Sequence, residues 1–149
     1  MLDKFKRYQQ EFKMKDLFPD RKDGLCACGC GTKLVGKQKR WSSEACSDRA
    51  YEIFSVLKGN TGMIRKLLYE KEQGYCRSCG VYDENWEADH ILPVFLGGGA
   101  TGIENFQTLC TDCHNEKSNN QMESHRKAIS SQAASIDLTV LLNDLEAVE

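Results

Sequence analysis

Apolar residues recur at helical spacing in several separate stretches of this 149-residue chain. The clearest stretch starts at a capping serine, Ser42 or Ser43, and runs to about Leu57. A second stretch starts at Thr61, which is expected to cap the helix, and Gly74 marks its C-terminal stop. Two further helices are predicted over residues 2–16 and 136–149, the second of them acidic with leucines on one side.

Strand-like runs replace the helical pattern in the second half of the chain. Residues 87–94 and 106–109 predict two short strands, and three successive glycines lie in the segment between them. A helix is expected after the second strand, and the polar residues 118–135, rich in Ser, Asn and Gln, are expected to form a linker. This order predicts a small, mostly helical α+β fold.

Composition narrows the class of protein. The chain has 8 Cys, 12 Gly and 28% charged residues, so part of it is expected to need a metal for stability. No apolar run approaches the roughly 20 residues of a membrane span, and the charged N-terminus lacks the apolar core of a signal peptide. We therefore expect a cytoplasmic protein without a membrane partner. Thiols stay reduced in that compartment, so the cysteines indicate metal binding rather than disulfides.

Charge is distributed unevenly along the chain. The formal net charge of −2 argues against non-specific coating of nucleic acid. Residues 25–43 nevertheless contain four basic side chains and no acidic one. A local basic patch of this kind can contact phosphates, and a solvated loop is an equal alternative.

Two Cys-x-x-Cys pairs give the strongest single signal. Cys76 and Cys79 form one pair, and Cys110 and Cys113 form the other. A two-residue spacer lets both sulfurs of one turn reach the same ion, and two such turns complete a tetrahedral zinc site. Redox Cys-x-x-Cys motifs are the rival interpretation, but they do not normally come in pairs. We predict a closed, structural zinc site.

The other four cysteines, Cys26, Cys28, Cys30 and Cys46, predict a second structural zinc site, with free thiols as the alternative. Their segment, CACGCGTKLVGKQKRWSSEAC, resembles short zinc-binding modules that end in an aromatic-Cys-Ser-x-x-Cys turn. Ser42 stands where such a turn has a cysteine. The identity of the ligands therefore stays open at this point.

The stretches CRSCG and ADHILPVFLGGGATGIENFQTLCTDCHNEK resemble the HNH endonuclease family, which has the ββα-metal fold. The resemblance covers about residues 62–120, and the chain looks like the stand-alone phage members of the family. The motif elements occur in the family's order, and His90, Asn105 and His114 match the three letters of its name. The implied core is a ββα-metal unit with a structural zinc, preceded by helices and the Cys-rich module.

The resemblance implies a role for each matching residue. His90 is expected to act as the general base on water, and Asn105 to brace the loop that holds the His90 ring. Asp89 and His114 are expected to bind a catalytic divalent ion, Mg²⁺ or another ion such as Mn²⁺. His114 directly follows a zinc-binding cysteine, yet the helix is expected to turn it toward this second ion. Glu87 could be an extra metal ligand or a solvent-facing charge, and the second is the favoured expectation.

The predicted function is a metal-dependent endonuclease that nicks or cuts double-stranded DNA, in a bacterial or phage-infected host cell. An RNA substrate would need the same chemistry. The alternative is a non-catalytic zinc protein that binds DNA or another protein, for example an accessory factor of a phage packaging enzyme. The residues expected to contact nucleic acid are Lys117, Arg77, Lys37, Lys39 and Arg40.

Four regions are expected along the chain. These are an N-terminal helix and linker (1–24), a Cys-rich zinc module with a helix (25–60), the nuclease domain (61–120), and a polar linker with an acidic helix (121–149).

Overall fold

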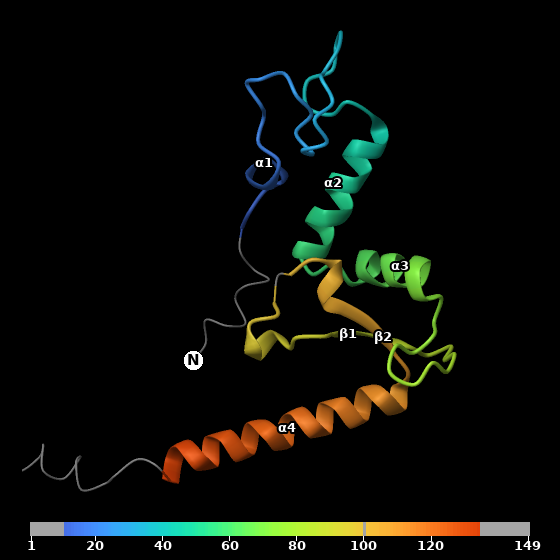
Figure 1. The fold of residues 1–149 in the computed structure, drawn as a ribbon, viewed down its shortest axis with the longest axis vertical. Coiled ribbons are helices and arrows are strands. Elements are labelled where there is room, and N and C mark those ends of the chain that lie inside the picture. The colour runs from blue at the N-terminus through green and yellow to red at the C-terminus, as the bar shows by residue number, and fades with distance from the viewer. Residues whose placement is uncertain (1–10, 100, 135–149) are drawn as a thin grey trace, which may run out of the picture.

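The structure, a computed structural model, describes residues 11–99 and 101–134. Within these residues the chain is a small α+β protein with four α-helices and one two-stranded sheet (Figure 1). The elements are α1 (Met14–Leu17), α2 (Glu44–Leu57), α3 (Thr61–Glu72), β1 (Glu87–His90), the 3₁₀ turns η2 (Val94–Leu96) and η3 (Ile103–Asn105), β2 (Phe106–Leu109) and α4 (Thr111–Ala134). The predicted helix over 136–149 lies outside the described residues, as does most of the one over 2–16.

Side-chain caps set where α2 and α3 begin. Ser43, one of the two serines expected at this position, accepts a hydrogen bond from the Cys46 amide at 3.2 Å. The cap of α3 is Asn60, whose side chain accepts from the Met63 amide at 2.9 Å. The prediction of Thr61 as a cap was wrong by one residue, because Thr61 is already helical.

The sheet separates two sides of the molecule. β1 and β2 run antiparallel, and α3 and α4 lie on opposite sides of them (Figure 1). The paired positions are Glu87 with Leu109, Ala88 with Thr108, Asp89 with Gln107, and His90 with Phe106. Because successive side chains of a strand alternate between faces, Ala88 and Phe106 pack toward α3. Glu87, Asp89 and Gln107 face α4.

β1 is shorter than the sequence predicts. It ends at His90, whereas the strand-like run was expected to reach Val94. The Ile91 amide donates to the Asn105 backbone carbonyl at 2.7 Å, and the Leu92 amide donates to the Asn105 side chain at 2.8 Å. These two hydrogen bonds take the place of further strand pairing between β1 and β2, and Pro93 then leads into η2.

α4 is longer than the sequence predicts. Residues 118–134, expected to form a linker, continue the helix from Thr111. The segment contains neither Gly nor Pro to stop it, and Glu123 and Lys127 form an i,i+4 ion pair at 2.7 Å on its surface. Among the described residues, no helix is both long and apolar enough to cross a membrane.

The main core lies between α2, α3 and the sheet. Its fully or nearly buried members are Val56, Ile64, Leu68, Trp86 and Phe106. A second, smaller cluster contains Leu109 with Cys76 and Cys110, on the side where α4 begins. The core therefore fixes the sheet against α3, and the cysteines fix it against α4.

Truncation at the centre of the main core should be costly. Leu68 is 0% exposed, so Leu68→Ala is expected to lower the free energy of unfolding by about 2–5 kcal/mol. Leu96→Ala, at a leucine that is 62% exposed, should change it by less than about 1 kcal/mol. Urea denaturation of both variants, with zinc retained, measures the difference. Equal costs would show that Leu68 is not at the centre of the core.

Candidate active site

The thiols of Cys76, Cys79, Cys110 and Cys113 form one group, with all four sulfurs within 4.8 Å of one another. The Cys79 and Cys110 sulfurs are 3.7 Å apart. A zinc site with metal–sulfur distances of about 2.3 Å has sulfur–sulfur edges of about 3.8 Å. The spacing therefore fits a tetrahedral ion, and this group can hold zinc.

One thiol of this group is prepared to lose its proton. Burial acts to raise the pKa of Cys76, but backbone hydrogen bonds near Cys110 and Cys79 outweigh it and lower the pKa to about 6. A thiolate is the form that binds a metal. The amides that surround Cys76 thus favour its ligand state.

The thiols of Cys26, Cys28, Cys30 and Cys46 form a second group that also can hold zinc. The sulfurs of Cys26 and Cys28 are 3.3 Å apart, and those of Cys30 and Cys46 are 4.0 Å apart. Ser42 lies beside the group, with its hydroxyl 3.4 Å from the Cys46 sulfur and its amide donating to Cys26. The four cysteines converge without it.

His114 lies apart from the thiols, although it follows Cys113 in the sequence. Its Nδ1 is 3.2 Å from a Glu87 carboxylate oxygen, and its Nε2 is 3.9 Å from Oδ1 of Asp89. The Glu87 carboxylate beside Nδ1 favours a proton on that nitrogen, so Nε2, which faces Asp89, is the atom that could bind a metal. Sequence reasoning assigned Glu87 to solvent, and its side chain is in fact 44% exposed but oriented onto His114.

The second carboxylate oxygen of Asp89, Oδ2, is held by two hydrogen-bond donors. Oδ2 accepts from the Gln107 side chain at 2.9 Å and from the Lys117 ammonium. Lys117 also donates to the His90 backbone carbonyl. Oδ1 of Asp89 and Nε2 of His114 therefore face each other while their far atoms are engaged. A hard oxygen and an imidazole nitrogen arranged in this way suit a divalent ion.

His90 lies on the opposite face of β1. Its ring packs on Phe106 with 4.3 Å between centroids. Burial lowers the pKa of His90, and the charge of Lys117 lowers it further, against an opposing effect of Asp89. The lowered pKa favours the neutral imidazole, which is the form that can accept a proton.

Asn105 ties together the loop that follows His90. Its side-chain nitrogen lies 3.1 Å from the Leu92 carbonyl, 3.0 Å from the Gly98 carbonyl and 2.9 Å from the Thr101 hydroxyl. A Cβ at Gly98 would overlap the Leu92 carbonyl. Glycine is required there because the two backbone segments approach so closely.

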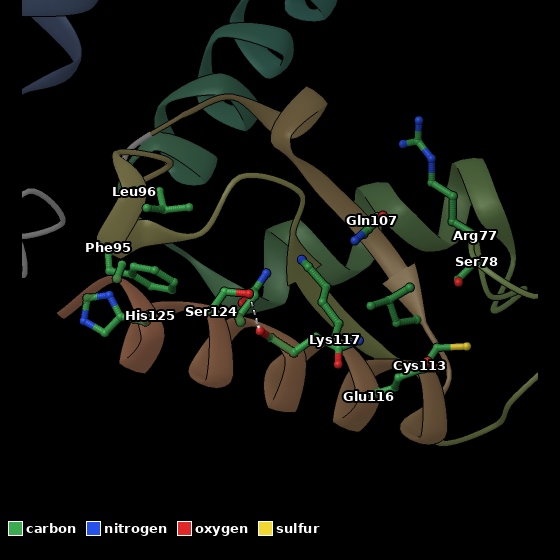
Figure 2. A pocket seen from close by; sticks show the side chains of 14 residues that line it. Arg77, Ser78, Phe95, Leu96, Gln107, Cys113, Glu116, Lys117, Ser124 and His125 are labelled. Carbon is green, nitrogen blue, oxygen red and sulfur yellow. Dashed lines mark hydrogen bonds between the residues drawn. The ribbon is translucent and has the colours of Figure 1, made fainter. Parts of the chain in front are cut away.

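A groove of about 840 Å³ runs along α4 (Figure 2). Lys117 extends from α4 toward Gln107 on β2, and Phe95 lies beside His125 at the other end, with 5.4 Å between ring centroids. Arg77 borders the groove but points away from α4, 4.0 Å from Glu72.

The backbone segment that precedes α2 in the Cys-rich module lies away from the sheet, beyond the N-terminal end of α2 (Figure 1). Lys37 and Lys39 are exposed. Arg40 is engaged within the protein, because it donates to Asp20 at 2.6 Å and lies 5.9 Å from the Trp41 ring. A contact of these three residues with nucleic acid stays a prediction.

One segment of the chain contains both strands, the start of α4 and one complete thiol group. Residues 74–120 match the HNH endonuclease family model. This HNH segment contains Asp89, His90, Asn105 and His114. No solved structure gives a significant match to the chain.

The chain also has curated relatives, all with the name DNA annealing helicase and endonuclease ZRANB3. The human protein is 41% identical over 88 residues, which cover 52% of this chain and 8% of the relative. The mouse and bovine proteins are each 53% identical over 36 residues, which cover 24% of this chain and 3% of the relative. The chain thus spans less than a tenth of these relatives.

Each thiol group should account for one bound zinc ion. We expect about two zinc ions per purified wild-type chain and about one in either Cys79→Ser or Cys46→Ser, because three thiols close the tetrahedron poorly. Elemental analysis of the three proteins measures the ratio. One zinc in the wild type, with no further loss in Cys46→Ser, would show that the second group does not bind the metal.

Proposed function

We propose that the chain is a metal-dependent HNH endonuclease that hydrolyses phosphodiester bonds of DNA, with its nuclease domain at residues 61–120. The observation that carries the proposal is the pairing of Asp89 Oδ1 with His114 Nε2 at 3.9 Å, one residue from a neutral, half-buried His90, inside a segment that matches the family. The endonuclease activity in the names of the relatives supports the same reaction class.

His90 acts as the general base in this proposal. Its imidazole takes a proton from the attacking water, and the ring packs on Phe106. Asn105 positions it by holding the backbone at Leu92, two residues beyond His90. The described sheet has only two strands, so the outer edge of β1 has no described strand partner. A phosphate at that edge can meet His90 on one face and Asp89 on the other.

Asp89 and His114 would hold the divalent ion, Mg²⁺ or Mn²⁺, which when bound offsets the negative charge that develops on the phosphate and the leaving oxygen. Glu87 keeps His114 in the ligand tautomer, and Gln107 keeps the Asp89 carboxylate in place. Lys117, already beside Asp89, is placed to contact a phosphate near the same carboxylate.

The two thiol groups act as structural zinc sites in this proposal. They would also be expected of the alternative, a non-catalytic zinc adaptor, but that alternative leaves the arrangement of Glu87, Asp89 and His114 without a purpose. Nothing in the comparisons supports a phage packaging partner. The proposed substrate is double-stranded DNA, in line with the DNA in the names of the relatives.

Removal of the base should abolish cleavage. His90→Ala is expected to lower the nicking rate of supercoiled plasmid by about 10²–10⁴-fold with Mg²⁺ or Mn²⁺, because water then lacks its proton acceptor. Gel electrophoresis follows the conversion to open circles, and equal zinc content checks folding. Cleavage at the same rate by both proteins, or no metal-dependent cleavage by the wild type, would reject the endonuclease proposal. A matched RNA substrate tests the preference for DNA.

Loss of the Glu87 carboxylate should weaken binding of the catalytic ion. Glu87→Ala is expected to reduce Mn²⁺ affinity about 10–100-fold, because His114 loses the partner that fixes its tautomer. Glu87→Gln retains an acceptor oxygen and should have an affinity between those of Glu87→Ala and the wild type. Calorimetric titration with Mn²⁺ on zinc-loaded protein measures the affinities without reference to activity. Unchanged affinity in Glu87→Ala would show that the contact with His114 is incidental.

A further inference from the structure

A second cavity, of about 440 Å³, opens on the α3 side of β1, the side that His90 faces. The sheet contributes Ala88, His90 and Phe106 to its wall. Two cations also line it, Lys58 at the end of α2 and Arg65 within α3. The cavity therefore adjoins the proposed general base but lies on the opposite face of the strand from Asp89 and His114.

Arg65 is held in a fixed position at this cavity. Its guanidinium carbon lies 4.0 Å from the centroid of the Trp86 ring, and Nη1 donates to the Trp86 carbonyl at 3.0 Å. Trp86 belongs to the core and is 7% exposed, so the platform is rigid. A guanidinium has five N–H donors, and the bond to Trp86 uses one of them at this exposed arginine. The fork can therefore engage a ligand while it stays on the ring.

The described residues that line the cavity carry more positive than negative charge. The ammonium of Lys58 lies 4.1 Å from the Phe12 ring centroid, which keeps this cation near the rim. Among the described residues that line the cavity, Glu87 is the one acid, and its carboxylate is oriented onto His114. The net positive charge of these described residues favours an anion next to His90.

We propose that this cavity is a phosphate subsite, in which Arg65, assisted by Lys58, binds a backbone phosphate of the DNA strand whose scissile phosphate faces His90. The planar guanidinium suits two phosphate oxygens at once. Such an interaction fixes the register of the strand and carries no sequence preference. The subsite rests on the proposed function, because it assumes that His90 faces the scissile phosphate.

The salt dependence of DNA binding tests the subsite. In a His90→Ala background, which prevents cleavage, a fluorescent duplex is titrated at several salt concentrations with and without Arg65→Gln. Removal of one cation that neutralises a phosphate reduces the slope of log K against log salt by about 0.9. We expect a reduction near this value for Arg65→Gln and a smaller one for Arg65→Lys, which keeps the charge. Lys58→Gln, outside the Trp86 platform, should also reduce the slope.

Lys66→Gln is the matched control, because this neighbouring cation on α3 pairs with Glu52 and Glu70 at 3.4 and 3.7 Å. Its slope should equal that of the background. Unchanged slopes in both Arg65→Gln and Lys58→Gln, or an equal reduction in Lys66→Gln, would overturn the subsite. Zinc content and thermal melting confirm that each variant is folded. Plasmid nicking by the wild type is scored separately, so failure of the endonuclease proposal is distinguishable from failure of the subsite.

Discussion

Adjacent side chains of a β-strand point to opposite faces, and both halves of the candidate site depend on this alternation in β1. Asp89 faces α4, where His114 and Lys117 meet it, whereas His90 faces α3 and packs on Phe106. A slip of one residue in the register would exchange these environments. It would place an imidazole among the charges at α4 and a carboxylate against the core.

The thiol group that contains Cys76 and Cys110 is placed to hold the β1–β2 register at both ends of the sheet segment. Cys76 precedes β1, and Cys110 follows β2 directly, so closing their group joins the two ends of the sheet segment to the start of α4. α4 begins at Thr111, and its first turns carry His114 and Lys117. In the proposed structural role, the thiol group does no chemistry itself, but it would set the position from which His114 reaches Asp89.

Local patterns predicted much of this arrangement. The Cys-x-x-Cys spacing anticipated the first thiol group, and the Ser43 cap and β2 follow from short-range signals. Interactions between distant residues could not be predicted in the same way. Glu87 meets His114 far along the chain, and no spacing rule connects them. The end of β1 depends on Asn105, which lies 13 positions beyond Leu92. The polar composition of residues 118–134 suggested a linker, but the segment has no Gly or Pro and continues α4.

The electrostatics of the two faces differ because the proposed chemistry needs opposite charges on each. On the α4 face, Glu87 and Asp89 are anionic, and Lys117 offsets only part of that charge, which suits a divalent cation. On the α3 face, Arg65 and Lys58 line the cavity that also contains His90, which suits phosphate oxygens. In the proposed reaction, a phosphodiester at the edge of β1 that has no described strand partner would meet a cation site and an anion site in succession. The strand lies between the two sites, so each is built from side chains on its own face of β1.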